Sequence, residues 1–156
     1  MKGNPGVIAL LNEVLTGELT SINQYFLHGK MCLNWGYERL GKKIYEESID
    51  EMKHASKLVE RVLFLDGLPN LQKLGTLNIG QTAIEILRND LAFELGTVGR
   101  LNKGIEACRQ AGDNGSEDLL THILAETEEH VDWLESQLEL VQQVGEAHYL
   151  AQQIRS

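Results

Sequence analysis

Several residue types and patterns are scarce in this chain of 156 residues. Proline occurs only at Pro5 and Pro69, so long uninterrupted helices are possible. Cys32 and Cys108 are isolated and form no CxxC pair, which argues against a disulfide framework and favours reduced, buried thiols. No apolar run approaches the roughly 18 residues that a transmembrane helix needs. The sequence therefore predicts no membrane-spanning segment.

Positive charge is also scarce. The formal net charge is −9, and lysine and arginine form no cluster, which argues against nucleic acid as a partner and favours cations. The first residues lack the apolar core of a signal peptide, so we expect a cytoplasmic protein. Hydrophobic residues make up 42% and charged residues 24% of the chain, which is ordinary globular composition. The length predicts one domain over residues 1–156.

Apolar residues recur at intervals of three and four through most of the chain, which is the spacing of amphipathic helices. Pro5 suits a first helical turn, and Thr82 with Glu85 forms a possible capping box. The connection over 67–81 is long enough to run the length of a bundle. We predict an all-α bundle of four helices with one long crossover and a short fifth helix. The predicted helices are 5–34, 38–65, 82–110, 116–144 and 147–155.

A Glu-x-x-His step, Glu51 and His54, lies within the second predicted helix. Residues three apart share a helix face, so this carboxylate and imidazole point in one direction. Most of the pattern recurs after 76 residues, because Glu94 follows Glu18 and His130 follows His54 at that offset. The repeat indicates pseudo-twofold symmetry between two helix pairs, so the five side chains are predicted to converge.

Buried carboxylates destabilise a bundle core unless cations compensate their charge. Carboxylates together with imidazoles are ligands that suit a pair of iron or manganese ions. Ferritin-like carboxylate proteins bind two metal ions with one glutamate from each of two helices and a Glu-x-x-His step from each of the other two. The same offset applied to Glu51 predicts a second bridging carboxylate at position 127, but the chain has Thr127 there.

Sequence segments along the whole chain resemble the bacterioferritin family. They are 23–28 (NQYFLH), 47–55 (ESIDEMKHA), 64–72 (FLDGLPNLQ) and 130–135 (HVDWLE). The resemblance implies a ferritin-like four-helix bundle and a hollow cage of twenty-four subunits. It further implies that the cage stores ferric mineral and that haem b lies between subunit pairs.

The resemblance also implies a role for each of the five converging residues. Glu18 and His54 would be terminal ligands of one iron, Glu94 and His130 those of the other, and Glu51 a bridge. The implied activity is a ferroxidase that oxidises Fe(II) with dioxygen or peroxide. Tyr25 and Trp133 are candidate electron donors near the two metals.

Met52 follows Glu51 and points about 100° away from the metal-facing side of its helix. Methionine commonly fills gaps in protein cores, but the resemblance implies that this sulfur ligates haem b, paired with its symmetry mate across a twofold interface. Such a haem would pass electrons inward for iron release, with a ferredoxin as a candidate donor. The apolar wall of the haem site would contain Leu19, Ile22, Asn23, Phe26, Tyr45 and Ile49.

Thr127 departs from the family pattern, because its hydroxyl is a neutral and weak ligand. We expect lower affinity for Fe(III) and weaker coupling of the two irons. Three ways of functioning without this carboxylate stay open. In the first, Glu126 moves in as a substitute ligand, and in the second, Asp50 and Glu126 instead collect iron on the cage interior. In the third, a second subunit type with an intact site co-assembles with this one.

Other functions are compatible with parts of the pattern. One alternative is a haem-binding subunit with impaired oxidation that serves electron transfer and iron release, in homomeric or mixed cages. A second is a di-iron oxidase that acts on an organic substrate, which predicts a small oligomer with a substrate pocket. A purely structural helical bundle is the third.

Overall fold

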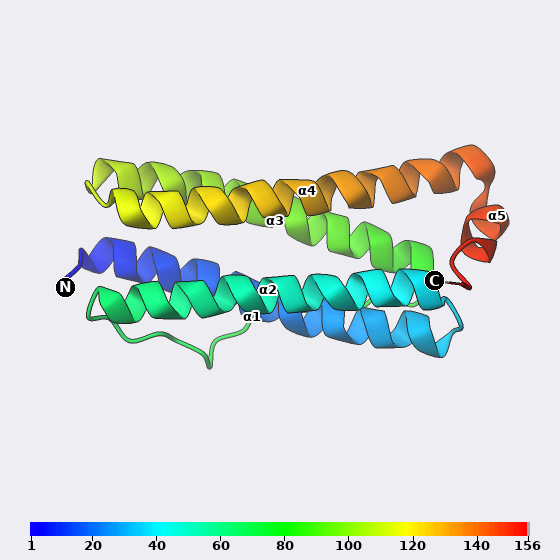
Figure 1. Ribbon diagram of the computed structural model, residues 1–156, viewed down its shortest axis with the longest axis horizontal. Coiled ribbons are helices and arrows are strands. Elements are labelled where there is room, and N and C mark those ends of the chain that lie inside the picture. The colour runs from blue at the N-terminus through cyan, green and yellow to red at the C-terminus, as the bar shows by residue number, and fades with distance from the viewer. Residues whose placement is uncertain (156) are drawn as a thin grey trace.

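The computed structural model describes residues 1–155 and consists of two helical hairpins packed side by side (Figure 1). The helices are α1 (Pro5–Asn34), α2 (Glu38–Phe64), α3 (Ala83–Gln110), α4 (Asn114–Val144) and α5 (Glu146–Ala151). The α1–α2 hairpin lies against the α3–α4 hairpin, and α5 turns away at one end of the bundle. The predicted all-α, ferritin-like bundle with a long crossover and a short fifth helix is confirmed.

Local signals at the helix ends explain most of these boundaries. The Asn4 side chain accepts hydrogen bonds from two backbone N–H groups at the start of α1, and Pro5 occupies the first turn. The Thr82 hydroxyl accepts the Glu85 N–H at 3.1 Å, which caps α3 as predicted. Asp113 likewise accepts the N–H of Ser116 at 2.9 Å. This cap starts α4 at Asn114, two residues before the predicted position.

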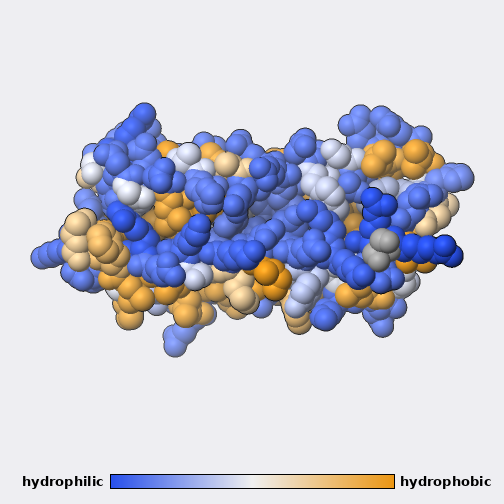
Figure 2. Space-filling view, viewed as in Figure 1, coloured by the Kyte–Doolittle hydropathy of each residue, from blue (hydrophilic) through white to orange (hydrophobic). Residues whose placement is uncertain are grey.

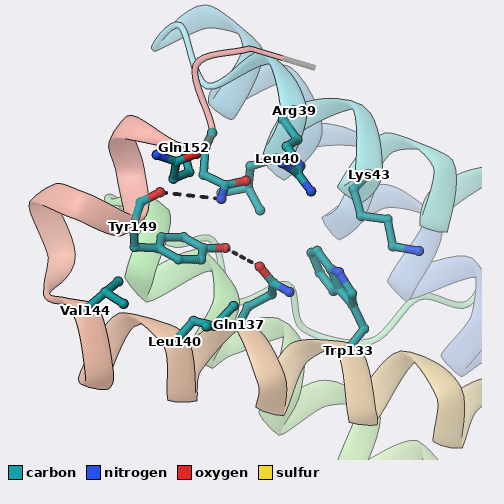
Figure 3. A pocket seen from close by; sticks show the side chains of 10 residues that line it. Arg39, Leu40, Lys43, Trp133, Gln137, Leu140, Val144, Tyr149 and Gln152 are labelled. Carbon is teal, nitrogen blue, oxygen red and sulfur yellow. Dashed lines mark hydrogen bonds between the residues drawn. The ribbon is translucent and has the colours of Figure 1, made fainter.

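The short fifth helix is held against the bundle by its tyrosine (Figure 3). The Tyr149 hydroxyl donates to Gln137 Oε1 on α4 at 2.8 Å, and Gln153 Nε2 donates to the Tyr149 carbonyl at 3.4 Å. The helix ends at Ala151, so the predicted extension to 155 is wrong. A cavity of about 450 Å³ lies between α2, α4 and α5, with Arg39 and Lys43 at its wall.

The core is divided along the bundle axis into two hydrophobic clusters. The first contains the N-terminal half of α1 and the C-terminal half of α2, including Leu11, Leu15 and Leu58. The second cluster contains the other halves of these two helices, including Ile44 of α2, and it also contains Leu87 of α3. On every long helix, buried polar residues lie between the parts that contribute to the two clusters. The bundle therefore contains a buried polar layer at mid-length.

The crossover between α2 and α3 follows a stripe of polar side chains on α1. Their spacing of four residues places them on one face of the helix. Backbone N–H groups of Gly75, Asn78 and Gly80 donate respectively to Thr20, Gln24 and His28 at 2.8–3.0 Å. The crossover thus runs the length of the bundle, and α3 starts at the end where α2 also starts (Figure 1). These hydrogen bonds explain how a segment without secondary structure is held in place.

The α1 stripe is itself tied to α3 through the buried Asp90. Gln24 Nε2 donates to Asp90 Oδ1 at 2.9 Å, and His28 Nδ1 lies 2.8 Å from the same oxygen. Because His28 Nε2 accepts the Gly80 N–H, Nδ1 must be the nitrogen that donates to Asp90. One buried imidazole therefore joins α1, α3 and the crossover.

The outer surface is mostly polar on the side that carries α2 and α4. Figure 2 shows hydrophilic side chains over most of this face, with hydrophobic side chains along its edges. Within residues 1–155, no helix combines the length and the apolar character needed to cross a bilayer.

The His28→Ala variant is expected to destabilise the bundle. It leaves the Gly80 N–H unpaired in the core and removes one of the two donors to the Asp90 carboxylate, at a cost of about 1–3 kcal/mol. Each kcal/mol lowers Tm by about 2–4 °C in a chain of this size, measurable by scanning calorimetry. His148→Ala is the control, because His148 is exposed on α5. Equal Tm values for the two variants would contradict the proposed role of His28.

Candidate metal centre

Two groups of metal-ligating side chains meet in the buried polar layer. One contains Glu18, Glu51 and His54, the other Glu51, Glu94 and His130, and the ligand atoms within each group lie within 4.8 Å of one another. All five residues are at most 5% exposed. They come from all four long helices, and Glu51 belongs to both groups. The structure thus brings together the five residues that the repeat singles out, with Glu51 between two adjacent sites.

Four buried side-chain atoms of this centre lack a hydrogen-bond partner within residues 1–155. Both carboxylate oxygens of Glu18, Glu94 Oε2 and His130 Nδ1 are buried without a hydrogen bond. His54 Nδ1 lies 3.2 Å from Glu51 Oε2 and 3.5 Å from Glu18 Oε2. Unpaired buried carboxylates are costly, and a cation between them would supply the missing interactions. The donor set therefore fits a pair of divalent cations.

Protonation compensates part of this negative charge when no cation is bound. Burial acts to lower the pKa of His54, but Glu51 and Glu126 outweigh it and raise this pKa to about 9. Burial opposes the charged form of His130 as well, yet Glu94 and Glu47 raise its pKa above the usual value. Burial also raises the pKa of Glu51, against the attraction of His54. The surrounding carboxylates thus favour the charged forms of both imidazoles when no cation is bound.

Tyr25 is part of the same buried layer. Its hydroxyl donates to Glu94 Oε1, and its ring lies 5.3 Å from the His130 ring in an edge-on arrangement. Burial, followed by the charge of Glu94, raises the pKa of Tyr25 well above its usual range. Trp133 stacks on His130 with a centroid distance of 6.1 Å. Both aromatic residues named in the sequence therefore lie beside one of the two groups.

Thr127 lies within the polar layer but supplies no atom to either group. It is 1% exposed, and its hydroxyl donates to the Ile123 carbonyl of its own helix at 2.8 Å. Glu51 consequently has no carboxylate counterpart on α4. The centre has three carboxylates and two imidazoles, where the repeat predicts a fourth carboxylate.

Glu126 and Asp50, the two further acidic candidates, lie outside both groups. Glu126 binds His54 Nε2, on the side of the imidazole opposite Nδ1, and lies 3.1 Å from His122 Nε2. Asp50 is half-exposed, and its carboxylate lies 3.8 Å from Lys53 Nζ. Neither side chain takes the place of the carboxylate missing at Thr127.

Glu47 is a buried carboxylate that the repeat did not identify. Its Oε2 lies 3.7 Å from His130 Nδ1, and its Oε1 lies 3.0 Å from Lys43 Nζ. Glu47 has no counterpart at the 76-residue offset, where position 123 is Ile123. Its spacing of four residues from Glu51 was the available signal, because it places both on one helix face.

Met52 lies on a different side of α2 from Glu51 and His54, as the helical spacing predicts. It is 54% exposed, whereas the two metal-ligating candidates are each 3% exposed. Phe26 and Ile49, two residues of the predicted haem wall, are also exposed apolar residues, at 48% and 38%. These side chains are available to a ligand or a second subunit.

Comparison with known proteins places this geometry in a family. Residues 8–144 match the ferritin-like domain. The chain is 53% identical to a Mycobacterium tuberculosis bacterioferritin over 152 residues, which cover 97% of this chain and 96% of the relative. The chain belongs to the bacterioferritin family. A Streptomyces coelicolor bacterioferritin is 47% identical, with 97% and 90% coverage, and one from Brucella melitensis is 46% identical, with 96% and 92% coverage.

Metal binding to this bacterioferritin should release protons. With a pKa of about 9, His54 is protonated at pH 7, and a cation that binds Nδ1 must displace that proton. Affinity for Co(II) should therefore rise from pH 6 to pH 9, and the number of protons released should fall. Calorimetry in buffers of different ionisation enthalpy measures both quantities. An unchanged proton count between pH 7 and pH 9.5 would contradict this expectation.

Proposed function

We propose that this chain is an iron-storage subunit that binds two iron ions in the buried polar layer and oxidises Fe(II) there. The observation that carries the proposal is the convergence of unpaired carboxylate and imidazole atoms between the two hydrophobic clusters. Glu18 and His54 would hold one iron, and Glu94 and His130 the other. Membership of the bacterioferritin family supports iron as the metal.

Bound iron would supply the electrons that reduce dioxygen or peroxide. The protein would fix the distance between the two ions, because Glu51 belongs to both ligand groups. Tyr25 would hold the Glu94 carboxylate in place through its hydroxyl group. The centre is buried between the two hydrophobic clusters, which strengthens the electrostatic interaction of each carboxylate with a cation.

Thr127 is expected to limit this activity. A bridging carboxylate would add a negative charge and a second shared pair of oxygens, both of which favour Fe(III). The Thr127 hydroxyl instead donates to its own helix. We infer slower oxidation than in a centre with two bridging carboxylates, and oxidation by a second, intact subunit in a mixed cage is compatible with this.

Assembly into a hollow cage of twenty-four subunits would give the oxidised iron a place to accumulate as mineral. The net charge of −9 suits a protein that concentrates cations. The polar α2–α4 face suits the inner surface of such a cage (Figure 2). A small di-iron oxidase with an organic substrate is less well supported, because the chain and its bacterioferritin relatives match over nearly their full lengths.

Haem binding is the second function that we propose, and the exposure of Met52 favours it. Met52 is 54% exposed, and Ile49, three residues earlier on α2, and Phe26 on α1 are exposed apolar residues as well. An exposed methionine is a suitable axial ligand at a twofold interface. The haem would transfer electrons inward to reduce stored mineral, with a ferredoxin as a candidate donor. This function does not require the carboxylate that Thr127 replaces.

Anaerobic titration of the metal-free homomer with Fe(II), followed by air, tests the metal centre. We expect two ions per subunit and oxidation faster than in buffer alone. Thr127→Glu should raise the initial rate about tenfold, equivalent to ~1.4 kcal/mol of barrier. Thr127→Ser retains a hydroxyl and serves as the control. Undetectable iron binding would overturn the proposed centre, and equal rates for the two variants would overturn the role of Thr127.

Replacement of Met52 tests the haem site through its spectrum. Met52→Leu keeps the volume but removes the sulfur, so the absorption bands of haem with two methionine ligands should disappear. Met31→Leu is the matched control, because Met31 packs against the second hydrophobic cluster. An unchanged haem spectrum in Met52→Leu would exclude Met52 as the ligand, whereas Fe(II) binding should be unaffected.

A further inference from the structure

We propose that Glu126 is a positioning residue that holds the His54 imidazole with Nδ1 directed at the metal centre. The inference rests on the proposed function, and it gives Glu126 a role other than that of a substitute ligand. The hydrogen bond between Glu126 Oε2 and His54 Nε2 carries it.

The two nitrogens of His54 face different surroundings. Nδ1 faces the centre, at 3.2 Å from Glu51 and 3.5 Å from Glu18. Nε2 faces a cavity of about 430 Å³ between α2 and α4, where it meets Glu126. A carboxylate accepts hydrogen bonds and donates none, so Nε2 carries a proton. Nδ1 is therefore the nitrogen whose lone pair is directed at a cation.

Glu126 is itself held on its second oxygen. Its Oε1 lies 3.1 Å from His122 Nε2, one helical turn earlier on α4. The Glu126 side chain is 43% exposed, so without these two imidazoles it would have access to many rotamers. To act as a metal ligand, it would have to break both contacts and pass around the His54 ring. The geometry favours orientation of His54 over direct coordination.

The other half of the centre lacks this arrangement. The position equivalent to Glu126 at the 76-residue offset is Asp50. Asp50 lies near Lys53 at 3.8 Å, and among residues 1–155 no carboxylate hydrogen bonds to the outer nitrogen of His130. A carboxylate thus holds the outer nitrogen of His54, whereas the carboxylates nearest to His130, Glu94 and Glu47, lie at its Nδ1. The site at His54 should bind a cation more tightly than the site at His130.

Titration of the metal-free, assembled protein with Co(II) tests this role, because visible absorption bands report each filled site. Glu126→Ala should weaken binding at one site about 10- to 100-fold, as loss of such a partner does in other metal sites, and leave two ions per subunit. Glu126→Gln should restore most of the affinity, since its amide oxygen accepts the Nε2 proton. Glu128→Ala is the matched control, because Glu128 is exposed on the same helix, and it should bind Co(II) like the parent chain.

Each alternative gives a different result. One ion per subunit in Glu126→Ala, with one set of absorption bands lost, would make Glu126 a ligand and overturn the positioning role. Unchanged affinity in Glu126→Ala, or equal weakening in Glu128→Ala, would also overturn it. Absence of Co(II) binding to the parent chain would instead refute the proposed metal centre. Gel filtration and circular dichroism confirm that each variant is assembled and folded.

Discussion

Compensation of buried negative charge is the constraint on which this bundle depends. Glu18, Glu51 and Glu94 are placed between two hydrophobic clusters, where an uncompensated carboxylate is strongly unfavourable. Without cations, the raised pKa values of His54 and His130 supply part of the missing positive charge. A bundle with an apolar layer at mid-length would avoid the cost of burying these charges. The polar layer is therefore best explained by what it binds.

The crossover determines which side chains meet in that layer. It carries the chain back along the bundle, so that α3 runs parallel to α2 and contributes Glu94 to the group that also contains Glu51 and His130. Hydrogen bonds from its backbone to Gln24 and His28 hold it on α1. The same His28 binds Asp90, one turn before Glu94 on α3. The contacts that hold the crossover thus lie one helical turn from the centre, in the same buried polar layer.

The two halves of the centre are related by sequence offset but differ in their chemistry. Thr127 lies where the repeat predicts a carboxylate, and Glu126 contacts His54 on one side of the centre. On the other side, Glu47 approaches His130 but is also paired with Lys43. We infer that such differences would give two bound cations unequal affinities.

The sequence by itself determined the helices and the five converging residues. Capping at Thr82 and helical periodicity are local properties, and the rigid spacing of a helix places Glu51 and His54 on one face. The partner of Glu126 was decided only by the tertiary structure. The angular positions of residues around one helix do not specify which nitrogen of a histidine on a neighbouring helix a side chain will contact. The approach of Glu47 to His130 depends in the same way on how α2 and α4 are rotated against each other. That rotation is set by packing of the whole core, which no short stretch of sequence encodes.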